Sequence, residues 1–336
     1  MRIAIGTAQG AFIANGAGAA PVRGLEGRNL RHLSRVGDAL LAGADSGAFR
    51  SLDGGRSWTA SGLEGTFVWD ATTDPRDART VYAVTQPSEL HVSRDGGATW
   101  MEIATVRTLP EAETWCLPLT PPQKPRARTI AVDRTNPARM WVGVEVGGLI
   151  RTGDGGRSWV VRTPYDNPDI HVMAVHPAKP DTLFVTTGLG RNENSQPIQQ
   201  RIGGVMRSDD GGETWQYVWR PSLPRYARPC CIDPRPPYAF TVGCGPTAFS
   251  SFRDPDGASA ELFQTTDEGR TWQSLGDPAH SPSRANYHAV TPDPAVVGGV
   301  LVGTDTGEVW RVSPEAKWEL VVEGMPQVQA LLPLAD

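Results

Sequence analysis

The octapeptide Ser51-Leu52-Asp53-Gly54-Gly55-Arg56-Ser57-Trp58 occurs, with small variations, five times in this chain. The other copies span residues 93–100, 152–159, 208–215 and 265–272. Each copy reads Ser/Thr-x-Asp-x-Gly-x-Ser/Thr-Trp. A motif that returns along a chain is the signature of a repeat architecture, so we expect stacked copies of one structural unit.

The chemistry of the motif predicts a tight corner between two strands. Its Asp can accept hydrogen bonds from the backbone of its own turn, and the Gly two residues later permits a left-handed conformation. The Trp then begins the outgoing strand and covers the corner with a large apolar face. Calcium binding or acid catalysis is the alternative, but five copies cannot all form one active site. We therefore expect a structural role for the motif aspartates, which are Asp53, Asp95, Asp154, Asp210 and Asp267.

The motif resembles the Asp-box, or BNR repeat, of the sialidase-like β-propeller superfamily. The resemblance implies a propeller but not an activity, because the superfamily includes sialidases, other glycan-degrading enzymes, sortilin-type receptors and photosystem II assembly factors. The chain is similar to poorly characterised bacterial seven-bladed Asp-box proteins. Sialidases share a Phe-Arg-Ile-Pro motif and a Tyr/Glu nucleophile pair, whereas this chain lacks the motif and Tyr287 has no assignable Glu partner. We therefore do not expect sialidase activity.

Hairpin patterns around the Asp-boxes give the number of units. An apolar hairpin precedes each box, and two further hairpins, near residues 3–13 and 300–310, lack a complete one. A single strand pattern at 328–334 remains at the C-terminus. The sequence therefore predicts an all-β, seven-bladed β-propeller with four-stranded antiparallel blades over residues 1–336, read as one domain. Strand 328–334 should pair with the hairpin at 2–14, which closes the ring and removes open sheet edges.

Composition argues against several classes of partner. The net charge is −5 at pH 7, and the basic residues are scattered, which argues against nucleic acid. No run reaches the roughly 18 to 20 apolar residues of a membrane span. Without a signal peptide pattern, a cytoplasmic protein is expected, and the cysteines, which lack metal spacing, fit that compartment. We expect a monomer that needs no cofactor, with a divalent metal left as an alternative. The cysteines are Cys116, Cys230, Cys231 and Cys244.

One face of the predicted propeller should carry the functional site. Long insertions fall on the face where the innermost strands begin, and such loops on a rigid scaffold often carry function, although tolerated loops are the simpler interpretation. Polar residues near the start of the innermost strands should surround the mouth of the central channel. The candidate ligand-binding residues are Arg31, His32, Trp69, Arg128, Arg228, Asn286 and Tyr287.

These residue types suggest specific chemistry at the channel mouth. Three arginines from alternate blades can converge on a carboxylate or a phosphate, and an indole such as that of Trp69 can stack on a sugar ring. Asp70, Glu145, His171 and His288 are the candidate catalytic residues, with Glu193 as a further carboxylate in a nearby loop. The imidazoles of His32, His171 and His288 would hold a metal only if they met; otherwise they line the channel.

Two functional hypotheses follow. The first is a propeller that binds a small polar molecule or a carbohydrate at the channel mouth, either as a binding protein or as a glycan-acting hydrolase or lyase. The second is a non-enzymatic scaffold for protein interaction or assembly, whose loops would expose apolar residues such as Leu117, Leu119 and Phe249. The concentration of polar residues at the mouth favours the first hypothesis.

Overall fold

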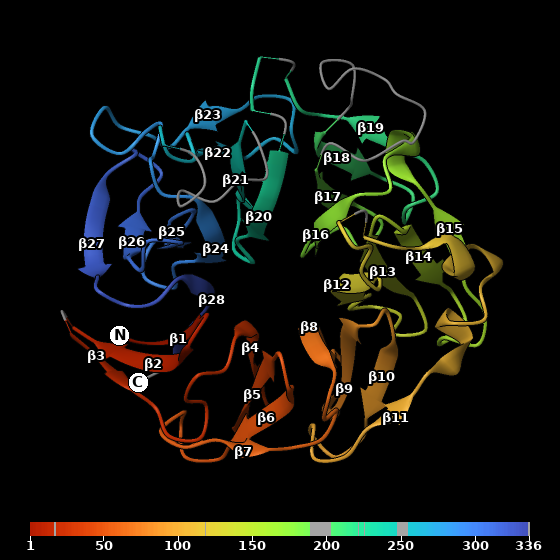
Figure 1. Ribbon diagram of the computed structural model, residues 1–336. Helices are drawn as coiled ribbons and strands as arrows, with labels where there is room; N and C mark the ends of the chain where they lie inside the picture. The colour runs from red at the N-terminus through yellow and green to blue at the C-terminus, as the bar shows by residue number, and fades with distance from the viewer. Residues whose placement is uncertain are drawn as a thin grey trace.

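Seven four-stranded antiparallel sheets surround a central axis in the computed structural model (Figure 1). The model describes residues 1–16, 18–117, 119–188, 203–220, 222–224, 226–246 and 255–334. Within these ranges the secondary structure is almost entirely strand, with three short 3₁₀ helices. The predicted seven-bladed β-propeller is confirmed.

Each blade is a meander whose first strand in the chain lies nearest the axis, except in blade 1, where the last strand of the chain takes that place (Figure 1). From the axis outward, blade 1 contains β28 (Val328–Leu334), β1 (Arg2–Thr7), β2 (Gly10–Asn15) and β3 (Gly18–Pro21); blade 2 contains β4 (Leu30–Val36), β5 (Ala39–Ala44), β6 (Gly47–Ser51) and β7 (Thr59–Ala60); blade 3 contains β8 (Phe67–Asp74), β9 (Asp77–Gln86), β10 (Leu90–Ser93) and β11 (Met101–Glu102).

The remaining four blades follow in chain order. Blade 4 contains β12 (Arg126–Val132), β13 (Met140–Glu145), β14 (Gly148–Thr152) and β15 (Val160–Arg162); blade 5 contains β16 (Ile170–Val175), β17 (Leu183–Thr187), β18 (Gly204–Ser208) and β19 (Gln216–Tyr217); blade 6 contains β20 (Tyr226–Ile232), β21 (Phe240–Gly245), β22 (Glu261–Thr265) and β23 (Gln273–Ser274); blade 7 contains β24 (Tyr287–Pro292), β25 (Val300–Thr304), β26 (Val309–Val312) and β27 (Trp318–Val322).

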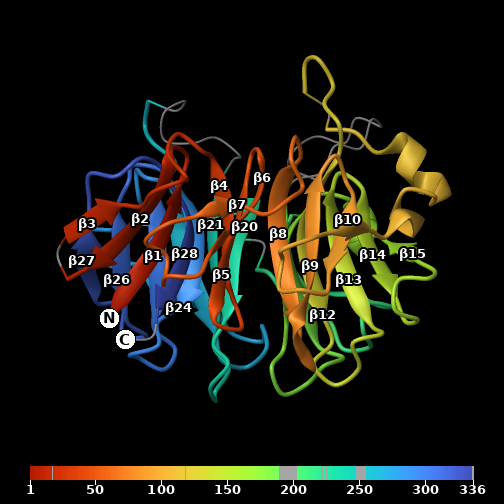
Figure 2. The ribbon, with the colours of Figure 1, turned by 90° about the horizontal axis from the view of Figure 1, so that it is seen from below.

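Three short helices lie outside the blades. They are η1 (Ala104–Val106), η2 (Pro110–Thr114) and η3 (Pro164–Asp166). Figure 2 shows η1 and η2 in yellow, on the outer side of the propeller. No helix among the described residues is long and apolar enough to cross a bilayer.

The two ends of the chain meet in blade 1. Strand β28 pairs antiparallel with β1, with Arg2 opposite Leu334 and Ile5 opposite Leu331. Figure 1 shows the N- and C-termini side by side at this blade. The predicted pairing of the C-terminal strand with the N-terminal hairpin is thus confirmed, and it leaves β1 without an open inner edge.

Apolar side chains from neighbouring blades form the core. Between blades 4 and 5, for example, Trp141 and Leu149 pack with Leu183, Val185 and Met206. The blades approach closely enough that a Cβ at Gly143 would lie 2.7 Å from Cγ2 of Ile170 in the next blade. Glycine at such second-strand positions therefore permits the close packing of adjacent blades.

The four cysteines differ in burial. Cys244 is buried, and Cys230 and Cys231 are half-buried in β20. All four cysteines are free, and Cys116 is exposed. Burial raises the pKa of the Cys230 thiol to about 12, so this group is an unreactive thiol at neutral pH.

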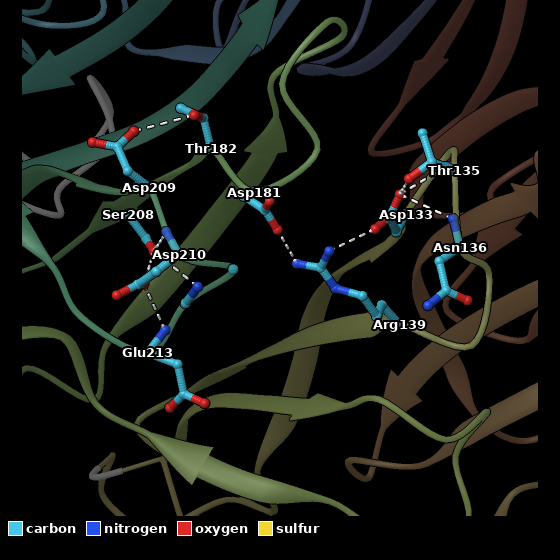
Figure 3. Close-up of polar contacts among 12 residues, drawn as sticks. Asp133, Thr135, Asn136, Arg139, Asp181, Thr182, Ser208, Asp209, Asp210 and Glu213 are labelled. Atoms are coloured by element: carbon cyan, nitrogen blue, oxygen red, sulfur yellow. Dashed lines mark hydrogen bonds and ion pairs between the residues drawn. The ribbon is translucent and has the colours of Figure 1, made fainter.

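The Asp-boxes form the corners that their chemistry predicts. In the fourth copy, Oδ1 of Asp210 accepts hydrogen bonds from the Ser208 hydroxyl at 2.8 Å and from the backbone N–H of Glu213 at 3.0 Å (Figure 3). Its Oδ2 accepts a bond from the Thr214 hydroxyl at 2.5 Å, and Gly212 takes a left-handed φ of 88°. The other box aspartates make the same kind of bonds within their own corners; they are Asp53, Asp95, Asp154 and Asp267.

Charged side chains tie adjacent blades together on the box side of the ring. Arg139 bridges Asp133 at 3.0 Å and Asp181 at 2.6 Å, which joins blade 4 to the turn that precedes β17 (Figure 3). Asp133 also accepts bonds from the backbone and hydroxyl of Thr135, so its buried carboxylate is fully used by the fold. This face therefore holds structural ion pairs.

Replacing Asp210 by Ala should destabilise the fold, because it removes the acceptor that satisfies backbone N–H groups of the corner. We expect the free energy of unfolding to fall by about 1 kcal/mol, as when a capping side chain is removed from a helix. Urea denaturation followed by circular dichroism measures this loss. Asp38→Ala, at an exposed position, is the control and should stay within about 0.5 kcal/mol of the parent. Equal stability of both variants would contradict the structural role.

The contribution of a box aspartate should depend on pH. Hydrogen bonds from Ser57 lower the pKa of Asp53 from its ordinary value of 3.8 to about 2. Because the folded protein holds the ionised form, its stabilisation is present above about pH 4 and is lost as the pH falls toward about 2. The destabilisation caused by Asp53→Ala, measured by denaturation at several pH values, should therefore shrink over this interval. A difference that stays constant down to pH 2 would argue against the ionised corner.

Candidate functional site

Every innermost strand carries a β-bulge at the equivalent position. In β12, Ala127 pairs with Val144 and Thr129 pairs with Gly143, which leaves Arg128 as an extra residue. The same break in register occurs in the other six strands, and in β20 it spans two residues, Arg228 and Pro229. Bulges redirect side chains and are frequent beside active sites. We call the redirected residues the bulge ring; they are Arg31, Trp69, Arg128, His171, Arg228, His288 and Gln329.

In blades 2 to 4, the indole of Trp69 is the group that the arginines contact. The guanidinium carbons of Arg31, Arg126 and Arg128 lie 5.0, 4.6 and 5.4 Å from the centre of its ring. Phe67 packs against it at 4.8 Å. These contacts are cation–π interactions that position the arginines. Sugar stacking on Trp69, suggested by the sequence, stays a prediction.

Glu145 neutralises two of the arginines. Its Oε1 accepts a bond from Nη2 of Arg126 at 2.9 Å, and its Oε2 accepts one from Nη1 of Arg128 at 3.1 Å. Burial raises the pKa of Glu145, but the two guanidinium groups outweigh it and hold the pKa below its ordinary range. Glu145 is therefore ionised at neutral pH and does not supply a proton.

His171 and Asp169 form a buried pair next to Glu145. Nδ1 of His171 lies 2.6 Å from the Ala227 carbonyl, so the ring donates a proton there, and Nε2 lies 3.3 Å from Oδ1 of Asp169. Burial raises the pKa of Asp169, but His171 outweighs it, so that the pKa is lowered overall. Glu145 and Asp169 are thus both held in the ionised form.

Glu145, Asp169 and His171 place possible metal-ligand atoms within 4.8 Å of one another, the one such group found among the described residues. Both oxygens of Glu145 already accept bonds from arginines, and two guanidinium charges beside them oppose a cation. These residues therefore do not suit a metal ion.

The three histidines that sequence offered as metal ligands do not share a site. Nδ1 of His32 lies 2.9 Å from Oδ1 of Asp70, whereas His171 faces Asp169. Nδ1 of His288 lies 3.4 Å from Nη1 of Arg228. The metal alternative based on these histidines is not supported, because each has a separate partner.

Among the residues that the structure describes, Arg31 and Arg228 lack a carboxylate partner, in contrast to Arg126 and Arg128. Within the described ranges, no ion pair joins either of them to an acid, and Arg228 contacts the Tyr226 hydroxyl at 3.1 Å and His288. Burial, together with the positive charges of Arg228 and Arg128, lowers the pKa of Arg31 to about 9. The ring region thus carries more guanidinium groups than carboxylates.

Buried polar atoms without a partner gather in the ring. Besides His171, whose Nε2 faces Asp169, five of its seven residues have a buried nitrogen or oxygen that makes no hydrogen bond to the part of the chain that the structure describes. Buried polar groups in proteins are satisfied by protein, water or ligand, so the centre of the ring needs one of the last two. The five atoms are Arg31 Nε, Trp69 Nε1, Arg228 Nε, His288 Nε2 and Gln329 Oε1.

The remaining predicted residues have other surroundings. Asp70 links three blades, because its Oδ2 also accepts a bond from the backbone N–H of Ile130 at 2.9 Å. Tyr287 packs between blades 6 and 7, away from the arginines, and the backbone N–H of Asn286 bonds to Asp305 at 2.8 Å. Leu117 is buried and Leu119 is 47% exposed. Glu193 and Phe249 lie outside the described residues.

Sequence reasoning missed three residues of this region, Arg126, Asp169 and Tyr226. Arg126 lies two positions before Arg128, and strand alternation alone places two such residues on one side. Asp169 directly precedes β16, and Tyr226 begins β20, so their position at the start of innermost strands was a usable signal. Their importance follows from the bulges, which the sequence does not mark.

Comparison with known proteins agrees with the fold. The BNR/Asp-box repeat model matches residues 206–217. A probable oligoxyloglucan-reducing end-specific xyloglucanase of Neosartorya fischeri is 27% identical over 179 residues, which are 52% of this chain and 19% of that protein. The predicted resemblance to Asp-box propellers is confirmed.

Solved structures show the same architecture at low sequence identity. The GH74 enzyme of Niastella koreensis superimposes with a TM-score of 0.62 at 16% identity, over 94% of this chain and 46% of that one. YCF48 from Cyanidioschyzon merolae gives a TM-score of 0.57 at 13% identity, over 87% and 84%. The chain spans less than half the length of the Niastella enzyme and about a fifth of the xyloglucanase. These likenesses establish the fold.

Replacing Glu145 by Gln should leave Arg126 and Arg128 without their counter-charge. We expect a loss of about 3 kcal/mol in the free energy of unfolding, as when one partner of a buried ion pair is removed. Inorganic phosphate should restore part of the lost stability by binding the two guanidinium groups that no longer have a counter-charge. Urea denaturation with and without phosphate measures both effects, with exposed Glu64→Gln as the control. Parent-like stability of Glu145→Gln would show that the arginines do not depend on it.

Proposed function

We propose that the bulge ring binds a small, hydroxyl-rich anion, such as a sugar acid, through its carboxylate or phosphate group. The observation that carries this proposal is Arg31, a half-buried residue whose Nε is buried without a hydrogen-bond partner and whose guanidinium has no acidic partner among the described residues. A buried charge without a counter-ion is costly, and an anionic ligand would remove that cost.

Arg31 and Arg228 are the proposed anchors of the anion. They come from blades 2 and 6, yet the charge of Arg228 acts on Arg31 strongly enough to lower its pKa. Two like charges brought together in this way repel, and an anion between them would turn the repulsion into attraction. Guanidinium groups also match the geometry of carboxylate and phosphate oxygens.

The neutral polar atoms of the ring would bind the rest of the ligand. Burial and the charges of Arg228 and Arg31 hold the pKa of His288 well below its ordinary value, so the imidazole is neutral at pH 7. Its unpartnered Nε2, with the oxygen of Gln329, offers hydrogen-bonding groups for sugar hydroxyls. The glycan named for the Neosartorya fischeri relative supports a carbohydrate.

Binding is better supported than glycoside hydrolysis. Hydrolysis by paired carboxyl groups needs one that stays protonated as the general acid. Glu145 and Asp169 both have lowered pKa values, and Asp70 is occupied by His32 and by the Ile130 backbone. Catalytic roles for Asp70, Glu145, His171 and His288 remain predictions, as does the cytoplasmic location.

The scaffold hypothesis has less support. Of the apolar residues expected to mark a docking surface, Leu117 is buried and Leu119 is exposed. The likeness to YCF48 reflects the fold alone at 13% identity. The unpaired charge in the ring, in contrast, calls for a small complementary ligand.

Replacing Arg31 by Gln should weaken binding of glucuronate at least tenfold, because a charge-assisted hydrogen bond contributes about 1.5 to 3 kcal/mol. Isothermal titration calorimetry with glucuronate, galacturonate and their neutral parents glucose and galactose measures the affinities. Arg35→Gln is the matched control, since Arg35 lies exposed on the same strand. Equal affinity for acids and neutral sugars, or parent-like binding by Arg31→Gln, would contradict the proposal.

A further inference from the structure

A cavity lies away from the bulge ring, between the loop at 279–285 and blade 7. Its volume is about 330 Å³. Tyr287 lines it, whereas the adjacent His288 belongs to the ring, because the β-bulge redirects His288 away from the regular pairing of β24. The two sites therefore share no lining residue.

Aromatic rings form one wall of this cavity. Trp310 and Trp318 have ring centres 6.0 Å apart at an angle of 65°, and His280 stacks on Trp318 with nearly parallel planes. The indole N–H of Trp318 donates to the Leu275 carbonyl at 2.7 Å, which fixes that ring. Trp310 and Trp318 are half-buried, so part of their apolar surface remains open to a ligand.

An oriented carboxylate lies on the same cavity. Oε2 of Glu308 accepts bonds from the hydroxyls of Thr304 and Thr306, both at 2.9 Å. No cation pairs with Glu308 in the described part of the chain, and its Oε1 has no hydrogen-bond donor there. Arg284, at the exposed rim, donates to the Pro255 carbonyl at 3.0 Å. The cavity thus offers acceptors and donors next to an apolar wall.

We infer that this cavity is a binding site for one neutral sugar ring. The apolar C–H face of a sugar matches the indole surfaces, and its hydroxyls can donate to Glu308 and accept from Arg284. A volume near the lower end of the usual range for ligand pockets fits a single ring. An organic cation would suit Glu308 and the indoles, but it would meet the positive charge of Arg284.

The inference is independent of the anion proposed for the ring. A molecule bound here would be recognised by stacking and by hydroxyl hydrogen bonds, without a counter-charge. Trp69 in the ring is covered by guanidinium groups, whereas Trp310 and Trp318 retain open surface. The two sites should therefore prefer differently charged sugars.

Saturation-transfer-difference NMR with the methyl glycosides of glucose, galactose, mannose and xylose tests the inference. We expect at least one to bind the full chain, with affinity reduced at least tenfold in both Trp310→Ala and Glu308→Gln. Glu308→Gln preserves the shape of the side chain and guards against misfolding of the tryptophan variant. Glu323→Gln, at an exposed position of blade 7, and Arg31→Gln should both bind as the parent does.

Three outcomes would overturn the inference: no binding of any methyl glycoside by the parent, binding unchanged in Trp310→Ala and Glu308→Gln, or binding lost in Arg31→Gln. Choline serves as the cationic probe, and choline bound in place of the glycosides would overturn the sugar assignment. Glucuronate titrations separate the two sites. If the parent protein binds glucuronate but no methyl glycoside, the result contradicts the sugar site in this cavity alone. If it binds a methyl glycoside but not glucuronate, the result contradicts the anion site in the bulge ring alone.

Discussion

Seven β-bulges, one in each innermost strand, turn polar side chains toward the axis of this propeller. Residues in a regular strand alternate between the two faces of a blade, and here both faces pack against neighbouring blades. A bulge releases one residue from that alternation, so a charged or aromatic side chain can leave the apolar packing without disturbing it. Because the ring of blades is closed by β28 and β1, all seven bulges lie in strands that surround one axis.

The arginines in and beside the bulge ring fall into two groups, those with a carboxylate partner and those without one. In blade 4, Glu145 neutralises Arg126 and Arg128, and Trp69 holds these guanidinium groups against its ring. Arg31 and Arg228 have no acid in direct contact among the described residues. Burial and the neighbouring arginines lower the pKa of Arg31, whereas for Arg228 burial is outweighed by the effects of Tyr226, Glu145 and Asp169, which raise the pKa. A guanidinium without an acidic partner, such as that of Arg31, stabilises the fold poorly. Local departures from the rules that stabilise a fold are characteristic of functional sites. An anion at the centre would satisfy the charges and several unpartnered atoms together.

Turn chemistry made the fold predictable from sequence, whereas the site was predictable only in part. The side chains of an Asp-box form hydrogen bonds with the backbone of the same turn, so each corner can be predicted from a short stretch of sequence. The blades, and the pairing of 328–334 with the N-terminal hairpin, follow from such local patterns. Arg31, Arg128 and Arg228 were found because they stand near the starts of innermost strands. Asp169 and Tyr226 were missed although they stand at the starts of innermost strands, because their contacts with His171 and Arg228 depend on how the bulges redirect those two residues. Tyr287 was grouped with His288 by proximity in sequence, although Tyr287 packs in the core between blades 6 and 7 and the bulge redirects only His288.

A crystal structure of the protein grown with selenate would test the central claim most directly. Selenate is a tetrahedral anion whose anomalous scattering identifies it without ambiguity. The account predicts an anomalous peak on the propeller axis, within hydrogen-bonding distance of Arg31 and Arg228, and its loss in Arg31→Gln crystals. Selenate found at surface arginines alone, or Arg31 found in an ion pair with a carboxylate of the protein, would contradict the claim that the ring is built for an anion.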